Sequence, residues 1–488
     1  MSTESTTYAP IPLAEVGEFD LTTDVVVVGY GIAGASAAIE AARAGAQVTL
    51  LERFSGPGGS SAQSGGELYL GGGTRVQKAL GITDTVEDMR AYLVAALGPH
   101  ADEEKIGVYC EGSVEHFDWF DAMGVGFHET LWDASGWMPF TKDGLMWLGE
   151  NAWPFTELAA PAPRGHRPPA PGFAGGALME KVTAAVEAEG VDVRLDTRAQ
   201  ALVVDESGAV VGLRVRGFDG DVTIRATRGV VLTTGGFVDN ERMLTAHAPD
   251  LLGHGKVSDG GDDGSGIEMA VAIGAATRRM GVVEVAYTFS PPMASRGMLV
   301  NGLGQRFATE DAYPGVPSHA ALHQPGPCWV IMDEEGFESL TPADTWGAQP
   351  KFAAETLEEL EVDLGLPAGS LVHTVALYNE GVARGEDPLF HKNASWLHEL
   401  KGPFAAFDPA DLSRASGSST TGFSGFTLGG LHTDVDGRVQ AATGGVVEGL
   451  YAAGRASSGM HGFGYVSGTS LGDGSFFGRR AGRAAATR

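Results

Sequence analysis

Apolar and polar residues alternate in blocks along the first 53 residues of the chain. The stretch DVVVVG at residues 24–29, with four consecutive valines, predicts a buried strand. Alanine and isoleucine then recur at a spacing typical of a helix over residues 35–45, which closes on Gly45. The stretch QVTLLE at 47–52 predicts another strand. This order of elements predicts a parallel strand–helix–strand unit.

Related patterns return further along the chain. A helical pattern covers residues 176–188, and residues 191–216 show strand patterns separated by a turn. Another buried strand is predicted at 229–236, where it ends on glycines, and residues 449–459 repeat that pattern. A last helix is predicted from about residue 472.

The segment 279–415 has a different pattern. It carries no strand-then-glycine signature, proline-rich stretches interrupt it, and it holds helical patterns at 353–365 and 372–385. We therefore predict an α/β protein whose first domain is built from two sequence pieces, residues 1–278 and 416–488, around an inserted domain. A chain of 488 residues is long enough for two domains.

The composition then narrows the classes of function. A net charge of −29 and a pI near 4.7 argue against nucleic acid and anionic membrane surfaces as partners. The two cysteines, Cys110 and Cys328, lack the spacing of a disulfide framework or a zinc site, so we expect no bound metal. The first 20 residues do not resemble a signal peptide, and no apolar run is long enough for a transmembrane segment. We expect a cytoplasmic protein.

The first predicted turn carries a dinucleotide-binding pattern. Gly29, Gly31 and Gly34 form GxGxxG between strand and helix, and Glu52 ends the second strand. Glycine lets the backbone approach a pyrophosphate, and an acid at the end of the second strand suits a ribose hydroxyl. A turn that served only for packing would leave Glu52 unexplained. A second loop of small residues, 58–66, would likewise let backbone amides approach a pyrophosphate or a ring system.

Four separated motifs resemble those of one flavoprotein family. GYGIAG with Glu52, GGSSAQSGG, GVVLTTGGF and GLYAAGR are similar to motifs of the fumarate reductase and 3-ketosteroid dehydrogenase family, over nearly the whole chain. Within that family, GYVSGTSLGDGSFFGRRAG resembles the 3-ketosteroid Δ4-(5α)-dehydrogenases. The resemblance implies a Rossmann-type FAD-binding domain in two sequence pieces with an inserted α+β catalytic domain, residues 279–415. It also implies noncovalent FAD, because no histidine stands near residues 61–63.

The motifs and the resemblance together assign the FAD-binding residues. They are Gly29, Gly31, Ile32, Ala33, Gly34, Glu52, Arg53, Gly59, Ser60, Ser61, Ser64, Gly65, Gly66, Ala201, Thr234, Gly235, Gly236, Asp263, Gly454, Arg455, Ser470 and Leu471.

Two positions separate the branches of the family. The fumarate reductases typically hold their dicarboxylate with a histidine and an arginine, at positions that match Phe426 and Tyr465 here. Carboxylates need cationic, fork-shaped donors, whereas phenylalanine and tyrosine suit an apolar ketone. The resemblance therefore favours a 3-ketosteroid as substrate and demotes a dicarboxylate.

The glycine-rich loop 462–474 carries the candidate chemistry. Desaturation between carbons 4 and 5 removes a hydride and a proton, and the proton lies beside the ketone. We predict Tyr465 as the base and Ser467 as the group that passes the proton outward, with Tyr313 implied by the resemblance as a third active-site residue. Three alternatives remain open: Tyr465 as an ordinary buried tyrosine, Ser467 as a helix cap and Tyr313 as a turn residue.

Other reaction classes also remain open at this point. A Δ1-dehydrogenase would use the same ketone, and a reductase of an activated double bond would use the same flavin. A flavin carrier without catalysis would leave the inserted domain without a purpose. No second GxGxxG suited to a nicotinamide is present, so the electron acceptor is unidentified.

Overall fold

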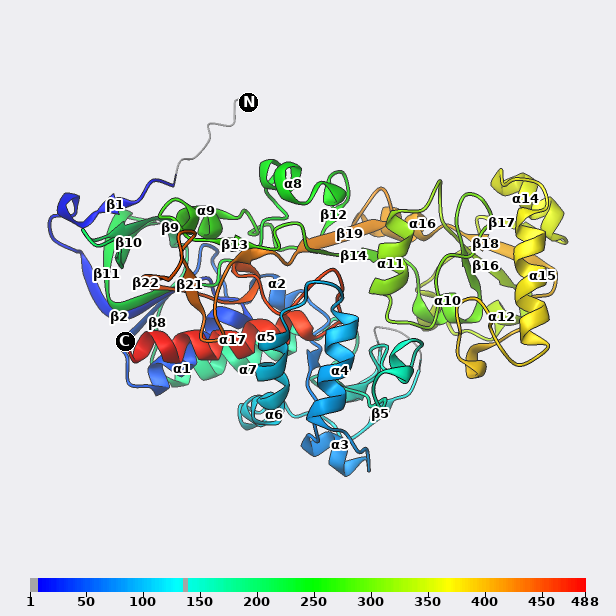
Figure 1. Ribbon diagram of the computed structural model, residues 1–488, viewed down its shortest axis with the longest axis horizontal. Coiled ribbons are helices and arrows are strands. Elements are labelled where there is room, and N and C mark those ends of the chain that lie inside the picture. The colour runs from blue at the N-terminus through cyan, green and yellow to red at the C-terminus, as the bar shows by residue number, and fades with distance from the viewer. Residues whose placement is uncertain (1–7, 135–138) are drawn as a thin grey trace.

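The computed structural model describes residues 8–134 and 139–488, so the start of the predicted first piece, at residues 1–7, lies outside it. The chain forms a large body around a central sheet, with a smaller lobe at one end (Figure 1). The two are joined by the long neighbouring strands β14 (Val283–Tyr287) and β19 (Phe423–Thr427), which pair antiparallel. This is the α/β architecture expected from the sequence.

The central sheet has nine strands in the order β1-β9-β10-β11-β2-β3-β8, with β22 pairing with β11 and β21 with β22. At its centre β22, β11, β2 and β3 run parallel, so that their carboxyl ends meet at one edge. The valines of β2 are almost fully buried, which explains the unbroken apolar run in the sequence. The strands span Ile11–Pro12 (β1), Leu21–Val28 (β2), Val48–Leu51 (β3), Asp192–Arg194 (β8), Arg198–Val204 (β9), Val210–Gly217 (β10), Gly220–Leu232 (β11), Arg438–Gln440 (β21) and Val446–Ala452 (β22).

Three helices pack close together below this sheet: α1 (Ile32–Arg43), α7 (Gly175–Ala188) and α17 (Thr469–Ala486) (Figure 1). Helices α1 and α17 approach each other closely because α17 carries glycine at the contact. A Cβ at Gly478 would lie 2.4 Å from the Ala33 carbonyl oxygen, and one at Gly482 would lie 2.1 Å from that of Ala37. Glycine on one helix and alanine on the other therefore bring the end of the chain against its beginning.

A helical segment and a small sheet cover the same body between residues 67 and 174. The sequence patterns did not single out this part of the chain. Its aromatic residues Phe117, Trp119, Phe120 and Phe127 are buried in the core. Its elements are β4 (Leu68–Tyr69), α3 (Arg75–Ala79), α4 (Val86–Ala96), α5 (Glu103–Glu111), α6 (Ser113–Ala122), β5 (Leu131–Trp132), β6 (Leu145–Met146) and β7 (Gly165–His166). The short helix α2 (Gly59–Ala62) precedes it, in the loop of small residues 58–66.

The smaller lobe is built around an antiparallel sheet in the order β15-β16-β18-β17. Its strands are Met298–Val300 (β15), Trp329–Asp333 (β16), Phe352–Ala354 (β17) and Phe404–Phe407 (β18). Its helices are α10 (Pro291–Arg296), α11 (Gly315–Leu322), α12 (Glu334–Glu338), α13 (Pro342–Thr345), α14 (Leu357–Leu364), α15 (Ser370–Val382) and α16 (Pro409–Ser416). The remaining helices α8 (Glu241–His247) and α9 (Ser265–Val271), and the short strands β12 (Gly255–Lys256), β13 (Thr277–Arg278) and β20 (Gly430–Leu431), lie in the body.

The expected helix over 353–365 starts later than its sequence pattern indicated. Residues 352–354 pair with β18 as strand β17, and α14 begins only after Thr356. The Thr356 hydroxyl accepts a hydrogen bond from the Glu359 amide at 3.3 Å, and the Glu359 carboxylate accepts one from the Thr356 amide at 3.2 Å. This reciprocal capping box sets the helix start. The predicted domain boundary at 415 falls in the last turn of α16.

Both cysteines are free and buried. Within residues 8–134 and 139–488, no helix combines the length and the apolar character that crossing a bilayer requires.

Candidate active site

A cavity of about 800 Å³ follows the carboxyl ends of the parallel strands β2, β3, β11 and β22. Open α/β sheets bind their ligands at this edge, and the volume lies in the upper part of the range for small-molecule sites, ~300–1,000 Å³. The cavity continues to β14 and α10, so it extends from the sheet to the smaller lobe.

The three glycines of the first turn have three different functions. Gly29 has φ +106°, and a Cβ there would lie 2.4 Å from the Thr233 carbonyl oxygen. A Cβ at Gly34 would lie 1.8 Å from the Gly29 carbonyl oxygen, so this glycine closes the turn against the helix. A Cβ at Gly31 would instead meet nothing closer than Ser61 Oγ at 3.4 Å, and Gly31 lines the cavity. Gly31 is therefore the position where a ligand can approach the backbone.

Glu52 lies at the end of β3 and is nearly fully buried in the cavity wall. Its carboxylate accepts hydrogen bonds from the Tyr30 amide at 2.8 Å and the Phe54 amide at 2.9 Å. Burial raises its pKa, and these two amides oppose that rise. The acid is thus held beside the glycine turn, where the dinucleotide pattern places a ribose.

Most of the predicted FAD-binding residues line this one cavity. Those in its wall are Gly29, Gly31, Ile32, Ala33, Glu52, Arg53, Gly59, Ser60, Ser61, Ser64, Gly65, Thr234, Gly235, Gly454, Arg455, Ser470 and Leu471.

Five predicted residues lie behind the wall, namely Gly34, Gly66, Ala201, Gly236 and Asp263. The glycines among them allow close packing: a Cβ at Gly66 would lie 2.6 Å from the Ala174 carbonyl carbon, and one at Gly236 would lie 2.4 Å from Thr427 Oγ1. Asp263 pairs with Arg53 at 2.8 Å and with Arg198 at 2.9 Å. The wall also includes residues that no motif signalled: Thr197, Arg198, Ala199, Lys256, Val257, Ser258, Asp259, Gly261, Asp262, Ser265 and Met269.

The wall fits FAD bound without a covalent link. A glycine turn before α1, a buried acid at the end of β3 and a second loop of small residues converge on one elongated space. The N-terminus of α1 faces that space, which favours an anionic pyrophosphate. No histidine or cysteine is among the described residues that line the cavity.

Tyr465, Ser467 and Tyr313 come together in this cavity, although Tyr313 lies 154 residues before Ser467. The Tyr313 and Ser467 hydroxyl oxygens share a hydrogen bond of 3.1 Å, and the two tyrosine rings lie 6.2 Å apart. Gly468, not Ser467, is the N-cap residue of α17, with φ +82°. The Ser467 side chain is therefore available to Tyr313 and does not cap the helix.

The environment of Tyr465 keeps its phenol protonated. Its ring stacks on His461 at 5.4 Å and meets Phe426 edge-on at 5.5 Å. Burial raises the pKa of Tyr465 well above the usual value, and the charges of Glu284 and Glu67 raise it further. The pKa of Tyr313 is raised in the same direction, mainly by burial and by Glu284. Both phenols are therefore hydrogen-bond donors at neutral pH.

Apolar side chains surround this polar group on the side of the smaller lobe. Phe140 and Phe173, which belong to the large body, also line the cavity and are 53 % and 65 % exposed, so they form an apolar rim at its mouth. The deeper apolar and aromatic residues of the wall are Tyr287, Phe289, Pro291, Trp346 and Leu412.

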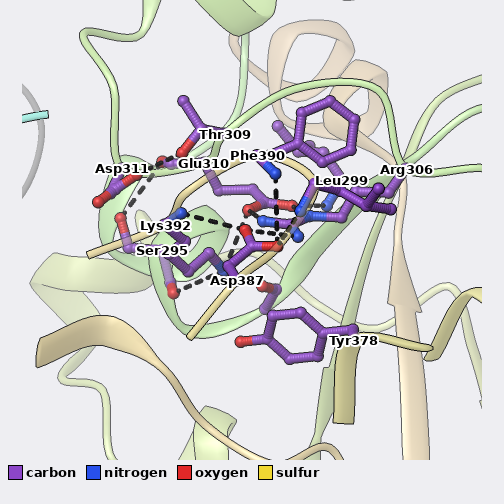
Figure 2. Close-up of polar contacts among 12 residues, drawn as sticks. Ser295, Leu299, Arg306, Thr309, Glu310, Asp311, Tyr378, Asp387, Phe390 and Lys392 are labelled. Carbon is purple, nitrogen blue, oxygen red and sulfur yellow. Dashed lines mark hydrogen bonds and ion pairs between the residues drawn. The ribbon is translucent and has the colours of Figure 1, made fainter. Parts of the chain in front are cut away.

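A buried ion-pair network holds the loop that carries Tyr313 (Figure 2). The Arg306 guanidinium pairs with Glu310 at 2.6 Å and with Asp387 at 2.7 Å, between the rings of Tyr378 and Phe390. Lys392 pairs with Glu310 at 3.1 Å. Burial raises the pKa of Glu310, but the two cations outweigh it and hold that pKa below the usual value. The loop leading to Tyr313 is thus tied to the segment that follows α15.

Replacing Arg306 with methionine should destabilise the protein by about 3–5 kcal/mol, because Asp387 would remain buried without its cation and Glu310 would keep only Lys392. Urea unfolding measures the change. Arg384 provides the matched control, because its pair with Glu386 is more than half exposed and its replacement should cost only about 0–1 kcal/mol. Equal losses at the two positions would contradict the importance of the buried network.

The comparisons with known proteins agree with this geometry. The family model described as an FAD binding domain matches residues 24–471. The crystal structure of a 3-ketosteroid Δ4-(5α)-dehydrogenase from Rhodococcus jostii RHA1, in complex with 4-androstene-3,17-dione, is 48% identical, with a TM-score of 0.92, and the match covers 98% of this chain and 100% of that one. A flavocytochrome c3 fumarate reductase structure in its open conformation is 27% identical, with a TM-score of 0.70 and coverage of 97% and 80%. The 3-oxo-5-alpha-steroid 4-dehydrogenase of Comamonas testosteroni is 28% identical over 88% of this chain and 92% of its own length.

The fold and the cavity define an FAD-dependent oxidoreductase. The chain belongs to the FAD binding domain family of flavoproteins, and the resemblance inferred from its motifs is confirmed.

Two acidic residues of the site escaped the sequence analysis. Glu284 and Glu67 both line the cavity near the tyrosines, and neither belongs to a motif. The signal that could have revealed Glu284 is a single acid within the apolar strand pattern VVEVAY. Glu67 pairs with Arg167 at 3.3 Å in a fully buried contact.

Proposed function

We propose that this protein desaturates 3-keto-5α-steroids between carbons 4 and 5. The observation that carries the proposal is the hydrogen-bonded pair of Tyr313 and Ser467 beside Tyr465, in a cavity that also presents aromatic and aliphatic side chains on the side of the smaller lobe. The 48% identity to a Δ4-(5α)-dehydrogenase over nearly the whole chain supports the same substrate class. When bound, FAD would supply the hydride acceptor.

Tyr465 would donate a hydrogen bond to the ketone oxygen. The sequence suggested a base at this position, but a phenol whose pKa is raised by burial and by two nearby carboxylates stays protonated. A protonated phenol stabilises the negative charge that develops on the oxygen as the carbon beside it loses its proton. The raised pKa therefore supports an acid-side role for Tyr465.

Ser467 would accept the proton from carbon 4 while passing its own to Tyr313. Their hydrogen bond of 3.1 Å gives this transfer a direct path. Gly468 has a left-handed conformation that turns the chain from Ser467 into α17, and Ser467 lines the cavity.

The electrostatics oppose a dicarboxylate substrate. Phe426 and Tyr465 occupy the positions where a fumarate reductase is expected to hold carboxylates. The charges of Glu284 and Glu67 act on this end of the cavity, and Arg455 is already paired with Asp262 at 2.6 Å. A neutral ketone avoids this repulsion, whereas two further carboxylates would add to it.

Product analysis distinguishes desaturation at carbon 4 from desaturation at carbon 1. The Δ1 enzymes typically carry prolines after the loop tyrosine, where this chain has Val466, Ser467 and Gly468. Proline fixes φ and removes a donor, so the two loops present their amides differently. We expect 5α-androstane-3,17-dione to yield the Δ4-3-ketone, identified by chromatography against both authentic products. A predominant Δ1 product would refute the proposed position of the double bond, but not the FAD site or the ketone site.

A reductase or a carrier would behave differently in one simple measurement. Anaerobic addition of the steroid bleaches the flavin of a dehydrogenase. The same addition leaves the flavin of a carrier unchanged. A reductase is recognised by the reverse test, in which an enone reoxidises its reduced flavin.

A further inference from the structure

The proposed reaction leaves one proton without a destination. Ser467 and Tyr313 can pass it on, but neither can keep it, because a hydroxyl that accepts one proton must lose another. The raised pKa of Tyr313 also excludes a resting phenolate as the acceptor. A group beyond Tyr313 must therefore receive the proton and deliver it to water.

Glu284 is the carboxylate that adjoins Tyr313. A Cβ placed on Gly315 would lie 2.5 Å from Tyr313 Cε1 and 2.8 Å from Glu284 Oε1, so the two side chains border the same small space. Glu284 is 4 % exposed and lies on β14 directly opposite Phe426 of β19. Glu284 therefore lies in the same part of the cavity wall as Tyr313 and Tyr465.

His319 connects Glu284 to the outside. Its Nε2 lies 3.1 Å from Glu284 Oε2, and 28% of its side-chain surface is exposed. Helix α11, which carries His319, is fixed to β14 because the Ser318 hydroxyl accepts a hydrogen bond of 2.9 Å from the Tyr287 amide. The distance between the carboxylate and the imidazole is thus set by packing between α11 and β14.

We propose that Glu284 and His319 carry the proton from Tyr313 to solvent, which makes them proton-transfer residues of the reaction proposed above, on which this inference rests. The series runs from Ser467 through Tyr313 and Glu284 to His319, from the buried cavity to the surface. Glu67 is the competing acceptor, but its carboxylate pairs with the buried Arg167.

The C4–H bond breaks and its electron pair enters the enolate. In the same concerted step the proton moves to Ser467 Oγ, the Ser467 hydroxyl proton moves to Tyr313, and the Tyr313 hydroxyl proton moves to the Glu284 carboxylate. The imidazolium of His319 yields one proton to water, and the proton on Glu284 then moves to His319, which restores the starting state. Loss of the carbon 5 hydrogen as hydride, for which bound FAD would be the acceptor, lets the enolate electron pair form the C4=C5 bond and restores the ketone.

Charges that face this pair come from three elements. Glu284 faces His319 of α11 and Tyr313 of the preceding loop. His319 faces Glu284 of β14 and Asp250, which lies after α8, and both carboxylates raise its pKa against the effect of burial. The imidazolium state that the transfer needs is therefore favoured by two neighbouring acids.

Single-turnover kinetics of the holoenzyme test the proposal. In weakly buffered, anaerobic solution, 5α-androstane-3,17-dione should bleach the flavin and release a proton to an indicator dye at the same rate. Glu284→Gln keeps the shape and removes the acceptor, and should slow both signals by ~10- to 100-fold, less than loss of a direct base. His319→Ala should slow proton release by ~3- to 10-fold, because water partly replaces it.

Rescue separates proton transfer from a structural contribution. Added imidazole should restore proton release in His319→Ala, since the site is open to solvent, and it should not affect Glu284→Gln. His323→Gln, at the exposed end of the same helix, should match the wild type. A normal rate of flavin bleaching in Glu284→Gln would overturn the proposal. A large loss of that rate in Glu67→Gln, with no loss in Glu284→Gln, would also overturn it. A His319→Ala defect that imidazole leaves unchanged would also overturn it.

An infrared titration needs neither steroid nor turnover. The carbonyl band of protonated Glu284 is assigned by its absence in Glu284→Gln. In the wild type the His319 imidazolium lowers the pKa of Glu284. Without it, in His319→Ala, the band should persist to higher pH. An unchanged titration would show that the two residues are not coupled. If the steroid fails to bleach the wild-type flavin while this coupling is present, the proposed function fails and the contact between the two residues stands.

Discussion

Replacing Tyr465 with phenylalanine should lower turnover by at least ~100-fold, the usual scale of one proton-transfer or hydrogen-bond contribution at a reacting group, while the FAD content stays normal. The ring remains and continues to stack on His461 and to contact Phe426, so packing is preserved. Only the donor to the ketone oxygen is lost. Steady-state turnover and the ratio of flavin to protein absorbance measure the two effects.

Tyr451 provides the matched control, because it is a buried tyrosine outside the cavity whose hydroxyl lies 3.4 Å from the Ala484 carbonyl oxygen. Tyr451→Phe should leave turnover unchanged. Ser467→Ala then distinguishes the two roles of Tyr465: if Tyr465 is the donor, Ser467→Ala falls at least as far as Tyr465→Phe. A small loss of turnover in Ser467→Ala, together with a large loss in Tyr465→Phe, would show that Tyr465 is the base. Near-full turnover of Tyr465→Phe would exclude both roles.

Replacing Gly31 with leucine should yield a folded protein that purifies without FAD and therefore has no turnover. The backbone at Gly31 has φ −81° and ψ −172°, which any residue can adopt, and a Cβ meets no atom closer than 3.4 Å. The fold should accept the substitution, but the leucine side chain would fill the space through which a pyrophosphate reaches the turn. Flavin in the supernatant after heat denaturation, together with thermal unfolding of the apoprotein, measures both outcomes.

Gly17 is a suitable control for this substitution, because it is exposed and its Cβ would meet nothing within 4 Å. Gly17→Leu should retain one FAD per chain. Gly34→Ala should differ from both variants, since its Cβ would lie 1.8 Å from the Gly29 carbonyl oxygen and the turn itself would not form. Normal FAD content in Gly31→Leu would show that the cofactor does not lie against this turn.

The site draws its polar groups and its apolar wall from different parts of the chain. The glycine turn, Glu52 and the loop before α17 belong to the sheet and its helices, whereas Tyr313, Glu284 and most of the apolar wall come from the smaller lobe and the strand that leads to it. Because β14 and β19 pair along their whole length, they hold the residues of the smaller lobe in a fixed position relative to those of the body. A shift of the lobe would therefore separate Tyr313 from Ser467 and interrupt the proton path.

The cofactor-binding part of the fold could be predicted from the sequence alone. The strand–helix–strand order, the glycine turn and Glu52 are encoded within about 30 residues, where local periodicity and turn geometry dominate. The inserted α+β lobe was visible as a change of pattern, and the positions of Phe426 and Tyr465 separated the family branches. Tyr465 and Ser467 could be proposed because they share one short loop with the glycines.

The tertiary structure decided what depends on long-range packing. The partner of Ser467 is 154 residues away, and the pairing of β14 with β19 together with the ion pairs of Arg306 holds the segment that carries it. The start of α14 followed from a neighbouring strand, and Ala201 and Asp263 lie behind the cavity wall because of sheet and ion-pair contacts. The proposal that Tyr465 is a donor also depends on distant residues: the charges of Glu284 and Glu67 act on it through space, and no local sequence pattern shows which carboxylates will surround a phenol.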